Sequence, residues 1–274
     1  MEVTLLGTGD TTGTPTVGCD CDTCVRARAE DRERSRFSVH VRNERTHESI
    51  LIDASPDFRQ QFLANGTPIP DAVVITHIHF DHLDGLGNVY RLRRDLPVFA
   101  SSSVDEVTGE SVAATVRRRY DYLDAVTVRA IDPYEPFSIC SLSARLLPVT
   151  HPPFDSYGLV IEDPSTGNRV GITGDTNYAI PERSRSALEG VDLLLADGIV
   201  PAAFCEDHPA GGKHRDECDV PRTFGSKHMT REGAMALADR LDVGQVRIVH
   251  VSHFYPADEA FEAPLAVDGE QFSI

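Results

Sequence analysis

The sequence predicts an α+β fold in which two β-sheets pack face to face and helices cover their outer surfaces. Short apolar strand patterns recur in both halves of the 274-residue chain, with helical patterns between them. Four separate strands each end on a histidine or an aspartate, namely His77, His151, Asp175 and His250. Because loops at one edge of a rigid sheet are where functional groups gather, the same pattern predicts a site at that edge.

The first half of the chain has strand patterns at its start and before the histidine-rich segment. Four strands are predicted, at residues 3–6, 37–41, 49–52 and 71–76. The first ends in a tight turn at residues 7–9, and the second and third form a hairpin. Ser55 at the N-cap, Pro56 at the first helical position and a stop at Gly66 predict a helix. A second helix is predicted at residues 85–94.

The second half repeats this order of elements. Five strands are predicted, at residues 146–150, 157–162, 169–173, 191–196 and 245–249. The second and third of these form another hairpin. A long loop is predicted at residues 198–226, and its pair Gly211-Gly212 indicates a mobile lid. Thr230 is predicted to cap a helix at residues 231–241.

Three histidines and an aspartate lie within six residues, from His77 to His82. In an extended backbone alternate side chains share a face, so His77, His79 and Asp81 are expected to project together, with His82 just beyond the bend. A chance run of buried histidines would not need this density of ligand-type residues. Two imidazoles can hold one metal ion while the carboxylate and the last imidazole hold a second.

Seven side chains are therefore predicted to hold two divalent ions. Metal one is assigned to His77, His79 and His151, metal two to Asp81, His82 and His250, and Asp175 is assigned as the bridge. Imidazole and carboxylate ligands suit Zn²⁺, with Mn²⁺ or Fe²⁺ as alternatives. Two such ions about 3.5–4 Å apart would hold a hydroxide as nucleophile. Asp81 would orient that water and accept its proton.

The composition is strongly acidic, with a formal net charge of −17, and its only lysines are Lys213 and Lys227. Excess carboxylates and few lysines favour a surface adapted to high salt over an ordinary acidic one, and they make the chain as a whole a poor polyanion binder. There is no 18-residue apolar stretch, so no membrane span is predicted. The N-terminus begins with a strand rather than a signal peptide, so a cytoplasmic location is expected.

The six cysteines do not form the pattern of a disulfide framework. Cys19, Cys21 and Cys24 lie too close together to bridge one another comfortably, and no export signal precedes them. Metal-bound thiolates are therefore predicted.

Taken together, the seven predicted ligands and their spacing resemble the metallo-β-lactamase superfamily. This resemblance implies an αβ/βα sandwich with a dinuclear site at the sheet edge. The continuation from His82 to Gly85 and the turn at residues 7–9 are similar to its phosphodiesterases. The segments Lys227–Thr230 and Val249–His253 resemble motifs of the tRNA 3′-processing endonucleases. There an extra histidine assists the leaving oxygen, so the resemblance implies a catalytic role for His228.

The cysteine-rich segment resembles the structural zinc loop of the phosphoribosyl cyclic phosphate phosphodiesterases of phosphonate breakdown. The resemblance implies a structural Zn²⁺ held by Cys19, Cys21, Cys24 and His253, a closed tetrahedral set. It covers nearly the whole chain, so residues 1–274 are expected to form a single domain. Relatives in this group are commonly dimers, which implies a homodimer.

The predicted loop at residues 198–226 departs from the family pattern. It contains Cys205, His208, His214 and Cys218, which are either ligands of a further metal or, as we favour, loop residues near the site. Lys213, His214 and Arg215 are candidates to meet a substrate phosphate.

The long arm with which tRNA-processing enzymes grip tRNA has no counterpart, because only a short hairpin fits between His151 and Asp175. The run Arg117–Arg119 with Tyr120 and Tyr122 is either an RNA-facing patch or, as we favour, a solvated helix face. The leading expectation is a dinuclear phosphodiesterase acting on a small or cyclic phosphodiester. An exonucleolytic ribonuclease and a non-hydrolytic metal-binding relative are the alternatives.

Overall fold

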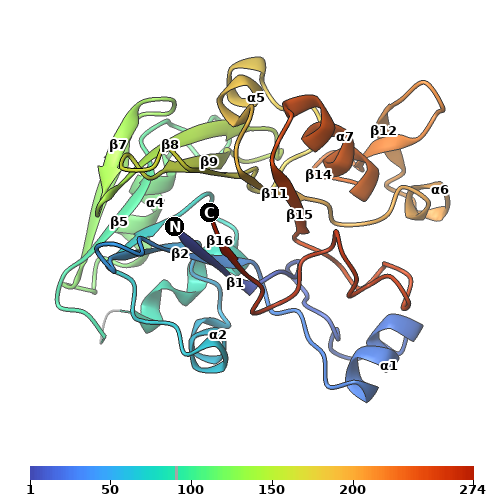
Figure 1. Ribbon diagram of the computed structural model, residues 1–274, viewed down its shortest axis with the longest axis horizontal. Coiled ribbons are helices and arrows are strands. Elements are labelled where there is room, and N and C mark those ends of the chain that lie inside the picture. The colour runs from blue at the N-terminus through green and yellow to red at the C-terminus, as the bar shows by residue number, and fades with distance from the viewer. Residues whose placement is uncertain (90–91) are drawn as a thin grey trace.

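The computed structural model describes residues 1–89 and 92–274, and two large β-sheets organise it (Figure 1). The first sheet has, in spatial order, β16 (Gln271–Ser273), β1 (Glu2–Gly7), β2 (Ser38–Arg42), β3 (Ser49–Ile52), β4 (Ala72–Val74), β5 (Leu96–Ser101) and β6 (Val126–Ile131). The second has β15 (Gln245–Val249), β11 (Leu193–Asp197), β10 (Arg169–Ile172), β9 (Ser156–Glu162), β8 (Leu142–Val149) and β7 (Pro136–Ile139).

Helices cover the outer faces of this pair of sheets. The helices α2 (Phe58–Asn65) and α4 (Val112–Arg119) pack against the first sheet, and α5 (Glu182–Leu188) and α7 (Arg231–Leu241) against the second. The other described helices are α1 (Asp22–Ala29), α3 (Phe80–Leu83) and α6 (Phe204–Asp207), with a 3₁₀ turn at Asp84–Asn88. In Figure 1, α2 lies below the first sheet, while α5 and α7 lie above the second. The predicted α+β fold with two packed sheets is confirmed.

The central core forms where the two sheets face each other. Ile52 and Val74 of the first sheet belong to the same fully buried apolar cluster as Leu193 and Leu195 of the second. Leu194 lies between these two leucines on β11 and packs in a separate cluster that includes residues of α7. Because side chains alternate along a strand, β11 is buried on both faces, which explains its unbroken apolar sequence.

Several predicted boundaries hold and others move. The Thr230 hydroxyl accepts a hydrogen bond from the Gly233 amide at 3.0 Å, as a cap of α7 should. Gly66 ends α2 in the left-handed conformation with φ 60°. However, α2 begins at Phe58 rather than Pro56, because Ser55 first forms a turn in which its hydroxyl accepts from the Asp57 amide and its carbonyl from the Phe58 amide.

The predicted helix at residues 85–94 is wrong. The described part of this segment is the 3₁₀ turn Asp84–Asn88, followed by irregular chain that leads into β5 at Leu96. Residues 90 and 91 lie outside the described residues. Two glycines in the segment lower its helical preference, and the amide of Gly85 is bound instead by the Ala54 carbonyl.

The predicted long loop at residues 198–226 is also wrong in part. It contains α6 and the strands β12 (Gly212–Arg215) and β13 (Pro221–Phe224), which form a small sheet with β14 (His228–Met229) just beyond the segment. In Figure 1 this hairpin stands out beside α7. Gly211 keeps the left-handed φ expected of a turn, but the chain after it is paired strand. In the part of the chain that the structure describes, we find no helix long and apolar enough to cross a membrane.

Candidate metal centre

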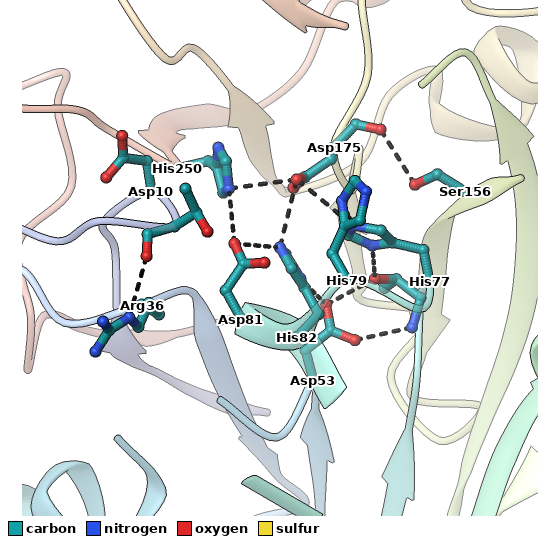
Figure 2. A network of polar contacts seen from close by, with 12 residues as sticks. Asp10, Arg36, Asp53, His77, His79, Asp81, His82, Ser156, Asp175 and His250 are labelled. Atoms are coloured by element: carbon teal, nitrogen blue, oxygen red, sulfur yellow. Dashed lines mark hydrogen bonds and ion pairs between the residues drawn. The ribbon is translucent and has the colours of Figure 1, made fainter. Parts of the chain in front are cut away.

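Several strand ends bring polar side chains to one place between the sheets, and Figure 2 shows His77, Asp175 and His250 there. β8 leads directly into the buried His151, and β15 into His250, whose φ of 58° turns the backbone at the sheet edge. After β10, Gly174 has φ 62°, and a Cβ there would lie 2.5 Å from the Tyr157 carbonyl oxygen. This position therefore requires glycine, and the turn that it permits directs Asp175 inward. The convergence of strand ends predicted from the sequence is confirmed.

The histidine-rich segment does not follow the extended path that we expected. His77 precedes His79, which is the N-cap of α3, and Asp81 and His82 lie within this short helix. The expectation that His77, His79 and Asp81 share a strand face is therefore wrong. The helical turn instead separates the segment into two pairs. His77 lies with His79, and Asp81 lies with His82.

The first group of ligand-type atoms is compact. His77 Nε2 lies 2.9 Å from His79 Nδ1, which is 3.3 Å from His151 Nε2. Asp175 Oδ2 lies 3.7 Å from His77 Nε2. Bonds of about 2.0–2.1 Å in a tetrahedral Zn²⁺ site place ligand atoms about 3.3 Å apart, so these spacings fit a single ion.

A second group shares the same carboxylate oxygen. Asp175 Oδ2 lies 3.3 Å from both His82 Nε2 and His250 Nε2. Asp81 Oδ2 lies 3.5 Å from His82 Nε2 and 3.7 Å from His250 Nε2. Both of these ring nitrogens are buried and make no hydrogen bond, an arrangement that costs about 1–3 kcal/mol each unless another partner binds them. The donor set and the unpaired nitrogens fit a second divalent ion.

Outer contacts fix the orientation of these rings. Asp53 Oδ2 accepts a hydrogen bond from His82 Nδ1 at 2.6 Å, and Thr76 donates to both oxygens of the same carboxylate (Figure 2). His151 Nδ1 donates to the Lys227 carbonyl at 3.1 Å. Such contacts leave Nε2 free as a lone-pair donor. The sequence analysis missed Asp53, although it follows an apolar strand in the same way as Asp175.

Burial and charge set the protonation of the site. Burial holds the pKa of His77 well below its ordinary value and lowers that of His151 to about 3, so both rings are neutral and able to bind a cation. Burial alone would raise the pKa of Asp81, but the neighbouring rings of His250 and His82 lower it to about 2. Asp81 is therefore a carboxylate at neutral pH.

His228 stands beside both groups. Its ring lies 4.7 Å from that of His151 and is stacked on that of His250 at 4.9 Å. His228 Nδ1 donates to Asp197 Oδ2 at 2.8 Å, and Asp197 is buried at the end of β11. Asp197 was also missed, although its position after the apolar strand Leu193–Ala196 is the same signal that identified Asp175. This pairing leaves His228 Nε2 as the nitrogen available to a ligand.

A separate cluster joins the N-terminal loop to the segment after β15. Ligand atoms of Cys19, Cys21, Cys24 and His253 all lie within 4.8 Å of one another. His253 Nδ1 lies 3.5 Å from Cys19 Sγ and 3.4 Å from Cys21 Sγ, and Cys24 Sγ accepts the Thr16 amide. Zn–S bonds of about 2.3 Å and Zn–N bonds of about 2.0 Å give similar S–N separations, so the set fits Zn²⁺.

Other candidate residues lie apart from these clusters. Among residues 1–89 and 92–274, Cys205, His208, His214 and Cys218 form no group of ligand spacing, so the structure does not support a further metal there. Strand pairing places Lys213 opposite Thr223, one position away from the pair of Phe224 with His228 and hence on the other face. Lys213, His214 and Arg215 make no described contact with the histidine cluster, and their role toward a phosphate stays a prediction.

The arginine run at the end of α4 is bound within the protein. Arg117 donates to the Val128 carbonyl, Arg118 pairs with Glu110, and Arg119 pairs with Asp84. These contacts favour the solvated helix face over an RNA-facing patch.

The chain matches known proteins over most of its length. A family model described as the beta-lactamase superfamily domain matches residues 48–251. An octanoyltransferase of Porphyromonas gingivalis is 30% identical over 261 residues, which cover 93% of this chain but 47% of that protein. The chain thus spans about half the length of that relative. Coenzyme PQQ synthesis protein B of Rhodopseudomonas palustris is 27% identical over 305 residues, covering 94% of this chain and 91% of that protein.

Several solved structures are similar to this chain over nearly its whole length. A diphosphatase from the PhnP family is 26% identical with a TM-score of 0.76, covering 99% of this chain and 96% of that chain. Zn²⁺-bound PqqB from Methylobacterium extorquens is 25% identical with a TM-score of 0.78 and full coverage of both chains. The short form of human tRNase Z, at 17% identity and a TM-score of 0.69 over 100% and 99% of the chains, is alike in fold.

Proposed function

Because this chain belongs to the beta-lactamase superfamily, we propose that it is a metal-dependent hydrolase that cleaves a P–O bond of a small or cyclic phosphodiester. The family membership confirms the resemblance predicted from the sequence. The phosphodiester as substrate, the two active-site ions and the roles of individual residues are parts of the proposal.

Seven side chains would hold the ions, in the two groups that share Asp175 Oδ2. When bound, two divalent ions supply a water of lowered pKa and positive charge that offsets the charge of a phosphodiester. Asp81 is ionised and lies in the first turn of α3, so its carboxylate can orient the attacking water and accept its proton. The buried, neutral His77 and His151 remain fixed by their outer contacts.

The observation that carries the proposal is the position of His228. His228 adds an eighth ionisable group to the seven predicted ligands, and its ligand atom lies within 4.8 Å of those of Asp175 and His250. It is held by Asp197, a buried aspartate outside the metal-ligand set. A histidine oriented in this way can donate a proton from Nε2 to a departing alkoxide, which is a poor leaving group. Hydrolysis of a phosphodiester with an alkoxide leaving group is accelerated by such a donor.

Other features favour a small substrate over RNA. Between His151 and Asp175 the chain forms only the β9–β10 hairpin, which leaves no long arm to grip a nucleic acid. The net charge of −17 opposes binding of a polyanion. The similarity to a PhnP-family diphosphatase adds P–O–P bonds to the substrates that deserve testing.

The test is a substrate panel at molar salt with the metal-loaded protein. Bis-p-nitrophenyl phosphate, a ribose cyclic phosphate, a dinucleoside diphosphate and labelled single-stranded RNA are compared, each with the wild type and with His228→Ala. We expect turnover of at least one small diester. Its rate should fall in His228→Ala by about 10²–10⁴-fold for alkoxide leaving groups, and by less for p-nitrophenolate.

The outcomes separate the proposal from its alternatives. Turnover of RNA alone would instead identify a ribonuclease. No turnover of any compound in the panel by protein with full metal occupancy would contradict hydrolysis and identify a non-hydrolytic metal-binding relative.

A further inference from the structure

A continuous column of aromatic rings runs from the cysteine cluster to the small sheet that carries His228. The ring of His253 lies 4.1 Å from that of Phe254, and Phe254 is stacked on Phe204 of α6 at 4.4 Å with an interplanar angle of 22°. Phe204 in turn lies 5.8 Å from Phe224 of β13. His208 closes the end of the column, 5.1 Å from Phe204 and 4.9 Å from Phe224.

The end of this column is the cross-strand partner of His228. Phe224 of β13 pairs with His228 of β14 in an antiparallel register. Directly opposite residues in such a pair project to the same face, with Cβ atoms about 4.5–5.5 Å apart. Phe224 and His228 are therefore neighbours on one face of the hairpin, and the strand pairing joins their backbones.

Two hydrogen bonds hold the turn of the hairpin formed by β13 and β14. Asn177 donates to the Ser226 carbonyl at 2.7 Å, and His151 Nδ1 donates to the Lys227 carbonyl. The base of the hairpin is also held, since the Ile199 amide donates to the Met229 carbonyl and α7 packs against β13. The column adds side-chain support at Phe224, through the half-buried Phe204 and Phe224.

We propose that Phe254, Phe204 and Phe224 are positioning residues for His228, and that they couple the cysteine cluster to the leaving-group side of the active site. His253 is both a member of the Cys19–Cys24 cluster and the first ring of the column. A Zn²⁺ bound there would fix that ring, and the column transmits its position over α6 to β13. The catalytic consequence rests on the proposed function, whereas the mechanical coupling does not.

Amide hydrogen exchange tests the coupling without any substrate. Phe254→Ala suits the test because this ring is 43% exposed, so the variant should fold. Exchange of the backbone amides of residues 224–229 is measured by mass spectrometry in the metal-loaded wild type, Phe254→Ala and Phe204→Ala. The matched control is Phe137→Ala, which removes a partly buried ring stacked on Phe99 at 5.3 Å, on the opposite edge of the second sheet.

We expect exchange of this segment to become about tenfold faster in Phe254→Ala and Phe204→Ala and to stay near the wild-type rate in Phe137→Ala. Phe204→Tyr should restore the wild-type rate, because it keeps the ring. Unchanged exchange in Phe254→Ala and Phe204→Ala, or an equal rise in all three alanine variants, would overturn the proposal.

The leaving group supplies the second readout. With an active wild type, Phe254→Ala should slow hydrolysis of an alkoxide diester about tenfold and leave bis-p-nitrophenyl phosphate within about twofold, since only the poor leaving group depends on a placed donor. Equal losses on both substrates would contradict positioning of His228. If the wild type hydrolyses neither substrate, the proposed function fails, and hydrogen exchange alone decides the coupling.

Discussion

Replacing Asp53 by asparagine should weaken one active-site metal and spare the other. Asp53 accepts hydrogen bonds from the Thr76 amide at 2.8 Å, the Thr76 hydroxyl at 2.7 Å and His82 Nδ1 at 2.6 Å. Asparagine keeps the size and tolerates the left-handed φ of 57° at this position. Its amide group, however, turns one of the acceptors into a donor.

The expected magnitude follows from these contacts. If the amide nitrogen faces the backbone amide, two donors meet. If it faces His82, the ring must accept at Nδ1 and carry its proton on Nε2, where it no longer has a lone pair for a metal. A hydrogen bond to a charged group contributes about 1.5–3 kcal/mol, which corresponds to about a tenfold to 150-fold loss of affinity. The loss should fall on the ion assigned to Asp81, His82 and His250.

Competition with a chelator, followed by metal analysis, measures this effect. The matched control is Asp57→Asn, the same change at a carboxylate that pairs with Arg36 and touches none of the ligands. We expect Asp53→Asn to release one equivalent at lower chelator concentration, while Asp57→Asn and the cysteine site behave as in the wild type. Two tightly held active-site ions in Asp53→Asn would refute the assignment of Asp53 as the residue that orients His82.

Four further outcomes are expected. Asp197→Asn should slow hydrolysis of alkoxide diesters about 10²-fold with little loss on p-nitrophenyl esters, as leaving-group kinetics would reveal; equal losses on both would argue against its role in holding His228. Cys21→Ser should lower the thermal unfolding midpoint by several degrees and bind one equivalent of metal less than the wild type, whereas the exposed Cys218→Ser should change neither; a full metal content in Cys21→Ser would exclude the proposed zinc site. Burial lowers the pKa of His40 to about 4, so the folded state binds fewer protons than the unfolded state between about pH 6.5 and 4, and stability falls as the pH falls through this range. His40→Leu should reduce this loss by up to about 3 kcal/mol in urea titrations, and an unchanged pH slope would count against it. The unfolding midpoint should rise steeply toward molar salt, because a net charge of −17 is then screened, and a flat salt curve would contradict the halophilic interpretation.

The sequence was sufficient to predict which ligand-type residues follow the strands, but not which residues orient the histidines. His151, Asp175 and His250 each follow an apolar strand, and this local pattern predicts their convergence because neighbouring strands end at a common edge. Asp53 and Asp197 follow the same pattern. They were missed because each acts on a histidine 29 or 31 residues away, a pairing that only the folded register establishes.

Local conformation was least predictable where tertiary contacts decide it. The turn from His79 into α3 depends on backbone bonds from residues 82 and 83 back to the His79 carbonyl, which the alternation of polar residues conceals. The hairpin at residues 212–224 was taken for a loop because its glycines and charges are typical of irregular chain. Its strand β13 is nevertheless held by α7 and by the bond from the Tyr178 amide to Thr223.

Three further predictions are not tested by the contacts within this chain. The homodimer, the single domain over residues 1–274 and the cytoplasmic location stay predictions. Sedimentation of the metal-loaded protein measures the first of them.

The most direct test of the central claim is anomalous diffraction from crystals of metal-loaded protein, recorded on both sides of the metal absorption edge. We expect three peaks. Two should lie about 3.5–4 Å apart on either side of Asp175 Oδ2, and one should lie among Cys19, Cys21, Cys24 and His253. A peak at the cysteines alone, with none beside Asp175, would contradict the account.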